Sequence, residues 1–265
     1  MNLENLTGEI EDWLEKADEE ENLRFIRLKG FESLKDTVAI ELLGYYGSVD
    51  RMVAKEVQKF GRKKKKLAGF FSSYFNEMVQ LYSGEILLPI TLLLSQIGSQ
   101  NFIITTGSFA IPDVISYRLA EELYEFYKKH KVSKILLIDG VYNHRRRIDK
   151  KPQVHRISTS GPRIKVINTR KANFTLMGQI ASSFLTYWSH DDNIPIEILV
   201  VDAFSEYDPI SSLELLKVLT KEWGIEDDFR ELKRKSQEFT QSYMKSGEEI
   251  NLEKQKEVDD PRFFI

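Results

Sequence analysis

Residues 101–140 read NFIITTGSFAIPDVISYRLAEELYEFYKKHKVSKILLIDG and decide the fold. An apolar run rich in β-branched residues opens the stretch, and a second run, VSKILLIDG, closes it. Between them, apolar residues recur at helical spacing, with Pro112 near the first turn of the predicted helix. Its predicted apolar stripe consists of Val114, Ile115, Leu119, Leu123, Phe126 and Tyr127. Because a run such as ILLI is typical of a parallel strand covered by helices on both faces, the stretch predicts a strand–helix–strand unit.

Strands and helices continue to alternate on both sides of this unit. Further segments with the composition of strands are 23–28, 37–46, 67–75, 85–96, 154–159, 163–169 and 195–203. Further segments with helical periodicity are 48–60, 177–188 and 209–223. Ser48 or Asp50 is the predicted N-cap of the first of these helices, and Ser160–Gly161–Pro162 is the predicted turn of a hairpin. The pattern predicts an α/β domain over residues 23–225, three-layered, with a mixed, mostly parallel sheet.

Composition and charge exclude several classes of partner. The chain has 265 residues and a net charge of only -3, from 38 basic and 41 acidic residues, so no overall field would recruit nucleic acid or an anionic membrane. The longest apolar stretch, 86–94, is far shorter than the roughly 20 residues that span a bilayer. The acidic first residues lack the features of a signal peptide, and the chain has no cysteine. We expect a cytoplasmic protein that binds neither nucleic acid nor membrane.

One run of five cations, RKKKK at residues 62–66, stands out from this balanced charge. The run follows a predicted helix, and lysines are favoured at the negative pole of the helix dipole. We interpret it as a solvated helix end. An anion-binding patch is the alternative.

Polar residues follow several predicted strands, where α/β proteins bind ligands. Asp202, Glu206 and Asp208 match no metal-binding loop, and Asp208–Pro209 is typical of a turn that begins a helix. Asp139, His144 and the arginines at 145–147 are interpreted as a solvated loop, or as a patch that pairs with an acidic partner surface. The alternative is a site in which His144 acts as a base oriented by Asp139, or in which the arginines bind phosphate. No G-x-S-x-G sequence is present to hold a nucleophile. We expect no catalytic residues, no metal and no cofactor.

The two ends of the chain differ from the domain between them. Residues 1–22 predict a short acidic, amphipathic helix that docks on the body or on a neighbouring subunit, and residues 226–245 predict a C-terminal amphipathic helix. The latter has a seam at spacings of three and four, made by Phe229, Leu232, Ser236, Phe239 and Tyr243. Such a seam packs either against another subunit or on its own domain. Residues 246–265 predict a flexible tail ending in Phe263, Phe264 and Ile265.

The succession of these segments resembles the proteasome assembly chaperone family in its archaeal and bacterial form. The resemblance is carried by residues 101–140 together with ELLGYYGSVDRMVAKEV (41–57), GQIASSFLTYWSHDDNIPIEILVVDAFSEYDP (178–209) and SSLELLKVLTKEWGIEDDFRELKRKSQEF (211–239). It implies a phosphorylase-like α/β fold and a non-enzymatic assembly factor whose partner is the proteasome core particle. A nucleoside phosphorylase- or hydrolase-like enzyme is the alternative, because this fold resembles theirs and fold does not decide function.

The resemblance also implies a role for the terminal residues. Some archaeal family members carry a C-terminal hydrophobic-tyrosine-any motif that enters pockets between the α subunits of the core particle. Here Phe263 would be the hydrophobic residue, Phe264 would take the tyrosine position and Ile265 would bear the free carboxylate. One such tail binds weakly, so the interpretation needs a homo-oligomer that presents several tails. The alternative is a scaffold whose tail packs only within its own oligomer.

Overall fold

The computed structural model describes residues 23–27, 34–44, 48–72, 74–75, 80–82, 85–107, 111–143, 146, 148–159, 165–167, 179–191 and 193–258. The strands are β1 (Arg24–Arg27), β2 (Val38–Leu42), β3 (Arg62–Phe71), β4 (Gln80–Tyr82), β5 (Glu85–Leu87), β6 (Ile90–Ile97), β7 (Gln100–Gly107), β8 (Lys134–Tyr142), β9 (Val154–Ser158), β10 (Lys165–Ile167) and β11 (Ile196–Ala203). The helices are α2 (Val49–Phe60), α3 (Asp113–Lys129), α4 (Gln179–Trp188), α5 (Pro209–Trp223) and α6 (Arg230–Val258). No helix in these ranges is both long and apolar enough to cross a bilayer.

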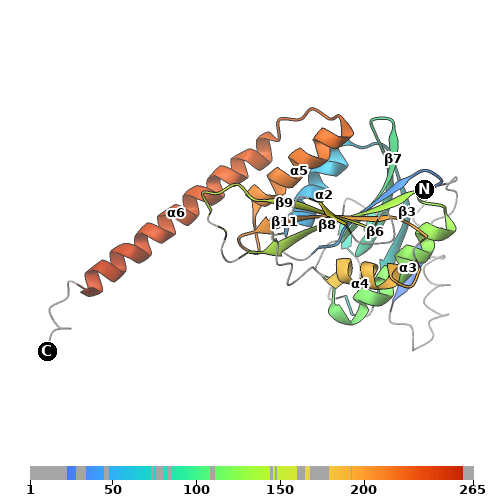
Figure 1. The fold of residues 1–265 in the computed structure, drawn as a ribbon, viewed down its shortest axis with the longest axis horizontal. Helices are drawn as coiled ribbons and strands as arrows, with labels where there is room; N and C mark the ends of the chain where they lie inside the picture. Colours follow the sequence, from blue (N-terminus) through green and yellow to red (C-terminus); the bar gives the residue numbers. More distant parts are fainter. Residues whose placement is uncertain are drawn as a thin grey trace.

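A mixed sheet forms the centre of the molecule (Figure 1). Within the described ranges it has nine strands in the order β1-β3-β6-β7-β2-β8-β11-β9-β10, while β4 and β5 form a separate pair. The four central strands, β7, β2, β8 and β11, pair in parallel, and the outer strands pair antiparallel with their neighbours. Six of the nine strands (β2, β3, β7, β8, β10 and β11) therefore run in the same direction, and the predicted mixed sheet is confirmed, with its parallel pairing confined to the centre.

Two helical layers cover this sheet (Figure 1). Helices α3 and α4 lie on one face over a core that includes Tyr124, Tyr127 and Phe184, and helices α2 and α5 lie on the other over Val53 and Leu216. Because both faces of the sheet are covered, the central strands are apolar on both sides. This explains the continuous apolar runs in the sequence. The predicted three-layer α/β fold is confirmed.

Local signals placed most helix boundaries correctly. Helix α5 has the predicted bounds, because Asp208 accepts a hydrogen bond from the Ser211 backbone N–H and Gly224 ends the helix with a left-handed φ of 64°. Ser48 does occupy the N-cap position of α2, but its hydroxyl donates to the carbonyl oxygen of Glu206 at 3.0 Å instead of capping the helix. That hydrogen bond ties α2 to the loop after β11.

Three predictions are corrected by the structure. The basic run 62–66 is not a helix end, because α2 stops at Phe60 and Arg62 begins β3. Val114 is 67% exposed, whereas the other five residues of the predicted α3 stripe are buried. Helix α6 continues to Val258, so residues 246–258, predicted as flexible, are helical. The predicted hairpin strands are found as the antiparallel pair β9 and β10, although the turn at 160–164 lies outside the described residues. The N-terminal helix predicted within 1–22 also lies outside them.

Candidate partner-binding arm

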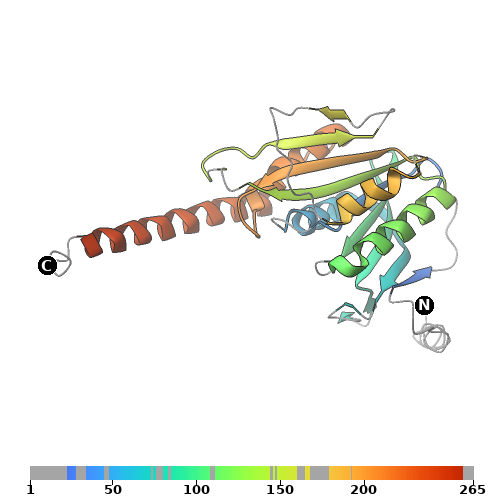
Figure 2. The same ribbon diagram turned by 60° about the horizontal axis from the view of Figure 1, so that its bottom comes forward.

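Helix α6 leaves the body of the protein as a long arm (Figure 1), and the second view in Figure 2 shows the same projection. Its 29 residues correspond to a length of about 43 Å. The first part, which we call the root (Phe229–Tyr243), packs against the domain, and the part beyond it extends away from the sheet.

Apolar burial fixes the start of the root. Phe229 and Leu232 are 5% and 3% exposed and belong to the core that α2 and α5 share. The Phe229 ring packs edge-on against Phe60 of α2, with 6.3 Å between the ring centroids. Phe229 has a positive φ of 49°, and its backbone N–H donates to Asp227 Oδ1 at 2.6 Å. This tight turn sets the direction in which α6 leaves the domain.

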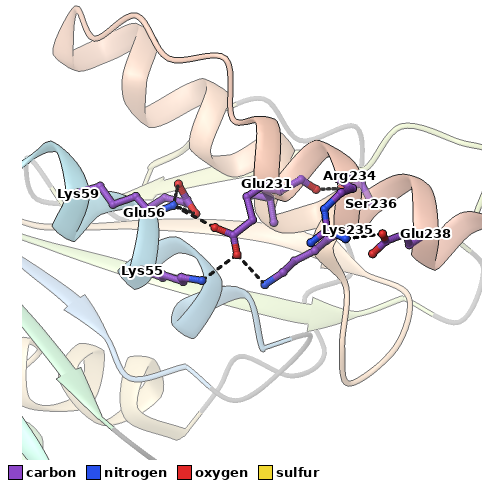
Figure 3. Close-up of polar contacts among 9 residues, drawn as sticks. Lys55, Glu56, Lys59, Glu231, Arg234, Lys235, Ser236 and Glu238 are labelled. Atoms are coloured by element: carbon purple, nitrogen blue, oxygen red, sulfur yellow. Dashed lines mark hydrogen bonds and ion pairs between the residues drawn. The ribbon is translucent and has the colours of Figure 1, made fainter. Parts of the chain in front are cut away.

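A group of charged residues joins the root to α2 (Figure 3). Glu231 lies between three lysines: its Oε1 is 2.8 Å from Lys55 Nζ and 3.4 Å from Lys235 Nζ, and its Oε2 is 3.4 Å from Lys59 Nζ. These lysines lower the pKa of Glu231 to about 2, with the hydrogen bond from Lys55 as the largest cause. Lys59 also contacts Glu56 at 2.8 Å. Because the group is exposed to solvent, it orients the arm more than it stabilises the fold.

Aromatic contacts complete the root. Phe239 packs edge-on against Tyr207 with 6.1 Å between ring centroids, and Tyr243 packs against Phe204 with 4.8 Å. The predicted seam therefore packs on its own domain over these positions. Tyr243 nevertheless remains 45% exposed and its neighbour Met244 is 49% exposed, so the end of the root offers apolar surface to a partner.

The loop that receives these aromatic rings is anchored by a buried ion pair. Arg146 Nη1 lies 2.5 Å from Asp208 Oδ2, and it also donates to Ser211 Oγ at 2.6 Å and to the carbonyl oxygen of Asp202 at 2.8 Å. Asp208 Oδ2 in turn accepts from the Phe204 backbone N–H at 2.7 Å. The prediction that Asp139 and Arg146 belong to a solvated loop or an exposed patch is wrong. Asp139 is 1% exposed within β8, and the Arg146 side chain is buried against Asp208. His144, Arg145 and Arg147 lie outside the described residues.

The other predicted polar positions form no metal centre. Within the described ranges, no group of three His, Asp or Glu side chains is placed to hold a metal ion. Asp202 instead faces His155, with 3.5 Å between Asp202 Oδ1 and His155 Nε2, a pair that the sequence did not reveal because the two residues lie far apart in the chain. Asp208–Pro209 begins a helix as predicted, and Asp208 is the N-cap of α5.

The sequence analysis did not identify two buried carboxyl groups whose pKa values are raised. Glu41 on β2 is 1% exposed, and its Oε1 accepts hydrogen bonds from the hydroxyl groups of Tyr127 and Thr105. Burial raises the pKa of Glu41 to about 7. Burial also raises the pKa of Asp50 to about 7, and the charge of Asp139 adds to this effect. The only signal for Glu41 was a glutamate inside the apolar run VAIELL.

The family model that matches the sequence covers residues 60–245 and describes the PAC2 family. The chain belongs to the PAC2 family. The match starts at the last residue of α2 and ends two residues beyond the root. Residues 246–258 of the arm and the last seven residues of the chain lie beyond the part that this PAC2 protein shares with the family model. The comparison with curated protein sequences gives no match.

Solved structures similar to this PAC2 protein share its fold. PbaB of Pyrococcus furiosus, described as an archaeal proteasome activator, is 18% identical, with a TM-score of 0.67 over 85% of this chain and 99% of PbaB. PbaA of the same organism, described as an archaeal homologue of proteasome-assembly chaperone, is 16% identical, with a TM-score of 0.64 over 88% and 99%. A proteasome-assembly chaperone homologue of Mycobacterium tuberculosis is 12% identical, with a TM-score of 0.57 over 79% and 94%. At these identities the likeness shows the fold alone.

Proposed function

We propose that this PAC2 protein is a non-enzymatic proteasome-binding factor, an assembly chaperone or activator, that docks its C-terminus on the α ring of the core particle. The residues that dock are Phe263, Phe264 and Ile265. The observation that carries the proposal is the direction of α6, whose outer end lies away from the domain (Figure 2). Membership of the PAC2 family supports the proteasome as the partner, as do the similar folds of PbaB, a proteasome activator, and PbaA, a homologue of proteasome-assembly chaperone.

The length of the arm argues against docking of the tail on its own domain. Fifteen helical residues separate Tyr243, the last contact of the root, from Val258, a distance of about 22 Å. If the last three side chains are to be buried, only residues 259–262 remain as a tether, and four residues span at most about 14 Å. A hollow of about 580 Å³ beside the root, lined by Ile148, Ile210 and Thr240 among others, is also beyond this reach. This reach supports docking of the terminus on another molecule.

The chemistry of the terminus fits a pocket between subunits. Burying each of the two phenylalanine side chains and the isoleucine side chain contributes roughly 1.5 to 3 kcal/mol before ordering costs. The terminal carboxylate favours a lysine at the pocket as a charge-assisted hydrogen bond. A four-residue tether on a helix loses less entropy on binding than the 20-residue flexible tail predicted from the sequence. Even so, one tail gains little net free energy, and strong binding requires several tails on one oligomer.

Deleting Arg262–Ile265 is expected to weaken binding to isolated proteasome core particle at least about tenfold, because the apolar anchor and its adjacent carboxylate are lost together. Surface binding of the intact oligomer is the measurement. Phe264→Tyr is the matched control: it keeps the ring and restores a hydroxyl worth roughly 0.5 to 1.5 kcal/mol, so it should bind equally well or more tightly. Equal binding by the full chain and the deletion variant would remove the tail from the mechanism.

We also propose that the arm joins copies of this chain into the oligomer that the tails require. The outer part of α6 is a helix of 15 residues beyond Tyr243, and an isolated helix of this length is only marginally stable in water. The exposed side chains of Tyr243 and Met244 lie where this outer part begins. In the sequence, the alternating spacing of three and four residues that defines the seam extends from Tyr243 to Ile250. Packing against the arm of another copy would bury these side chains and stabilise the helix.

Replacing Tyr243 and Met244 with glutamate is expected to shift the protein to monomers, because four or more charges would then meet between the arms. Sedimentation velocity of the full chain measures the state. Arg234→Ala is the control, since position 234 lies on the opposite side of α6 from Tyr243 and Arg234 forms an ion pair with Glu238 of the same helix. A double variant with the same mass as the unsubstituted oligomer would contradict the assignment of this surface.

A further inference from the structure

A hollow opens beside the root of the arm, between α6 and the loop that precedes β9. Its volume is about 580 Å³, within the range of about 300 to 1,000 Å³ that is usual for ligand pockets. One wall is the side of α6 that carries Ser236 and Thr240, and the other wall is formed by residues 148–152 and by Ile210 near the start of α5. The root of the arm therefore borders a recess large enough to hold bulky side chains.

Several polar groups that line the hollow are already paired within the chain. The hydroxyl group of Ser236 donates to the carbonyl oxygen of Leu232 at 2.8 Å, and the hydroxyl group of Thr240 donates to the carbonyl oxygen of Ser236 at 2.9 Å. Glu214 forms an ion pair with Lys151 at 2.8 Å. The apolar side chains of the lining are Ile148, Pro152 and Ile210. Because its polar groups are satisfied in this way, the hollow suits an apolar side chain better than a charged small molecule.

The exposed apolar end of the root lies on the same side of α6 as the hollow. Met244 follows Gln241 and Thr240, which both line the hollow, at spacings of three and four residues. Residues at these spacings share one side of a helix. A second helix packed against this side of the arm, at the usual interaxial distance of about 8 to 10 Å, would therefore also cover the hollow.

We propose that the hollow receives the exposed side chains of Tyr243 and Met244 from the arm of a second copy of this chain. This inference rests on the proposed association of copies through their arms, and it names the surface of the body that receives them. Methionine fits an irregular recess well, because its side chain is flexible and unbranched. Charge also favours this occupant, since the arm has glutamate at positions 248 and 249, about one turn beyond Met244, and the exposed Lys150 lines the hollow.

Filling the hollow with a side chain of the same copy tests the contact. Thr240→Trp is expected to raise the dissociation constant between copies at least about tenfold, measured by sedimentation velocity of the full chain. Glu238→Trp places the same ring on the opposite side of α6 and should leave this constant unchanged, and equal unfolding midpoints in urea show that both variants keep the fold. Suppose instead that Thr240→Trp associates normally while Tyr243→Glu with Met244→Glu separates the copies. The arms then join the copies without the hollow, and this inference alone is overturned.

Cross-linking gives a direct test that does not depend on the tryptophan variants, because the chain has no cysteine. Full-length chains carrying Lys150→Cys are coexpressed with chains carrying Glu248→Cys, so that a link between positions 150 and 248 always joins two copies. A short bismaleimide is expected to form this link, and Thr240→Trp in the first chain should lower its yield several-fold. Replacing Glu248→Cys by Phe264→Cys asks whether the terminus of a neighbour occupies the hollow instead. Links from 150 to 264 alone, links between two copies of 248 alone, or no links at all would each overturn the proposal. None of these outcomes depends on binding to the proteasome.

Discussion

Replacing Arg146 with alanine is expected to lower the free energy of unfolding by about 3 to 5 kcal/mol, the cost typical of breaking one side of a buried ion pair. The substitution leaves the carboxylate of Asp208, whose side chain is 0% exposed, without its counter-charge. It also removes the hydrogen bonds to Ser211 and to the Asp202 carbonyl oxygen. Urea denaturation followed by circular dichroism measures the loss.

Two controls separate the buried charge from general effects of removing an arginine. Arg156→Ala breaks contacts with Glu197 and Glu222, but these side chains are 13% and 39% exposed and the arginine itself is 30% exposed, so the cost should stay below about 1 kcal/mol. Arg146→Ala with Asp208→Asn should recover part of the loss, because no charge then remains buried. A cost below about 1 kcal/mol for Arg146→Ala alone would show that the pair does not hold the loop.

This prediction also concerns the arm, because the ion pair holds the segment against which the arm packs. Phe204 and Tyr207 lie between Asp202 and Asp208, and they contact Tyr243 and Phe239 of the root. The capping hydrogen bond of α5 comes from the same Asp208 side chain. The direction of α6 is therefore coupled to Arg146, which lies 62 positions before Asp208 in the sequence.

The features predicted correctly from the sequence are those whose cause is local. Helix α5 is bounded by Asp208–Pro209 and by Gly224, which act within one turn, and β8 and β11 are each marked by a continuous apolar run within the strand itself. The basic run 62–66 was misassigned because its strand conformation comes from pairing with β6, which lies some 30 residues further along the chain. A run of lysines carries no information about such a pairing.

The features missed at the candidate site also depend on distant partners. Arg146 resembles a solvated residue until Asp208 is brought beside it, and Glu41 resembles an interruption of a strand until Tyr127 and Thr105 surround it. The extension of α6 was missed because residues 246–258 are polar, a composition that disordered segments and solvated helices share. Apolar periodicity cannot separate these two states.

Replacing Glu41 with glutamine is expected to make the protein more stable at pH 8 but not at pH 5. Burial raises the pKa of this carboxyl to about 7, compared with 4.5 for an ordinary glutamate. The folded state thus binds the proton more tightly than the unfolded state. The stability that the protonated group contributes is fully present below pH 4.5 and is lost as the pH rises to 7. The total loss corresponds to about 3 kcal/mol, at 1.36 kcal/mol for each unit of pKa.

The most reliable quantity is the pH dependence of the difference in free energy of unfolding between Glu41→Gln and the unsubstituted protein. Glutamine keeps a side-chain oxygen that can accept hydrogen bonds from Tyr127 and Thr105. Its NH2 group takes the place of Glu41 Oε2, an atom with no hydrogen-bond partner among the described residues. That group costs about 1 to 3 kcal/mol at every pH, so it offsets part of the gain at pH 8. The cost cancels when the effect of the substitution at pH 5 is subtracted from its effect at pH 8.

We therefore expect the stability of Glu41→Gln relative to the unsubstituted protein to rise by about 2 to 3 kcal/mol between pH 5 and pH 8, measured by urea denaturation at both values. Asp50→Asn should change in the same direction, because burial also raises the pKa of Asp50 to about 7. Glu226→Gln, at an exposed position, controls for the loss of one negative charge. A pH-independent effect of Glu41→Gln would mean that this carboxyl ionises inside the fold as readily as in water, and that water or a cation reaches it between β2 and α3.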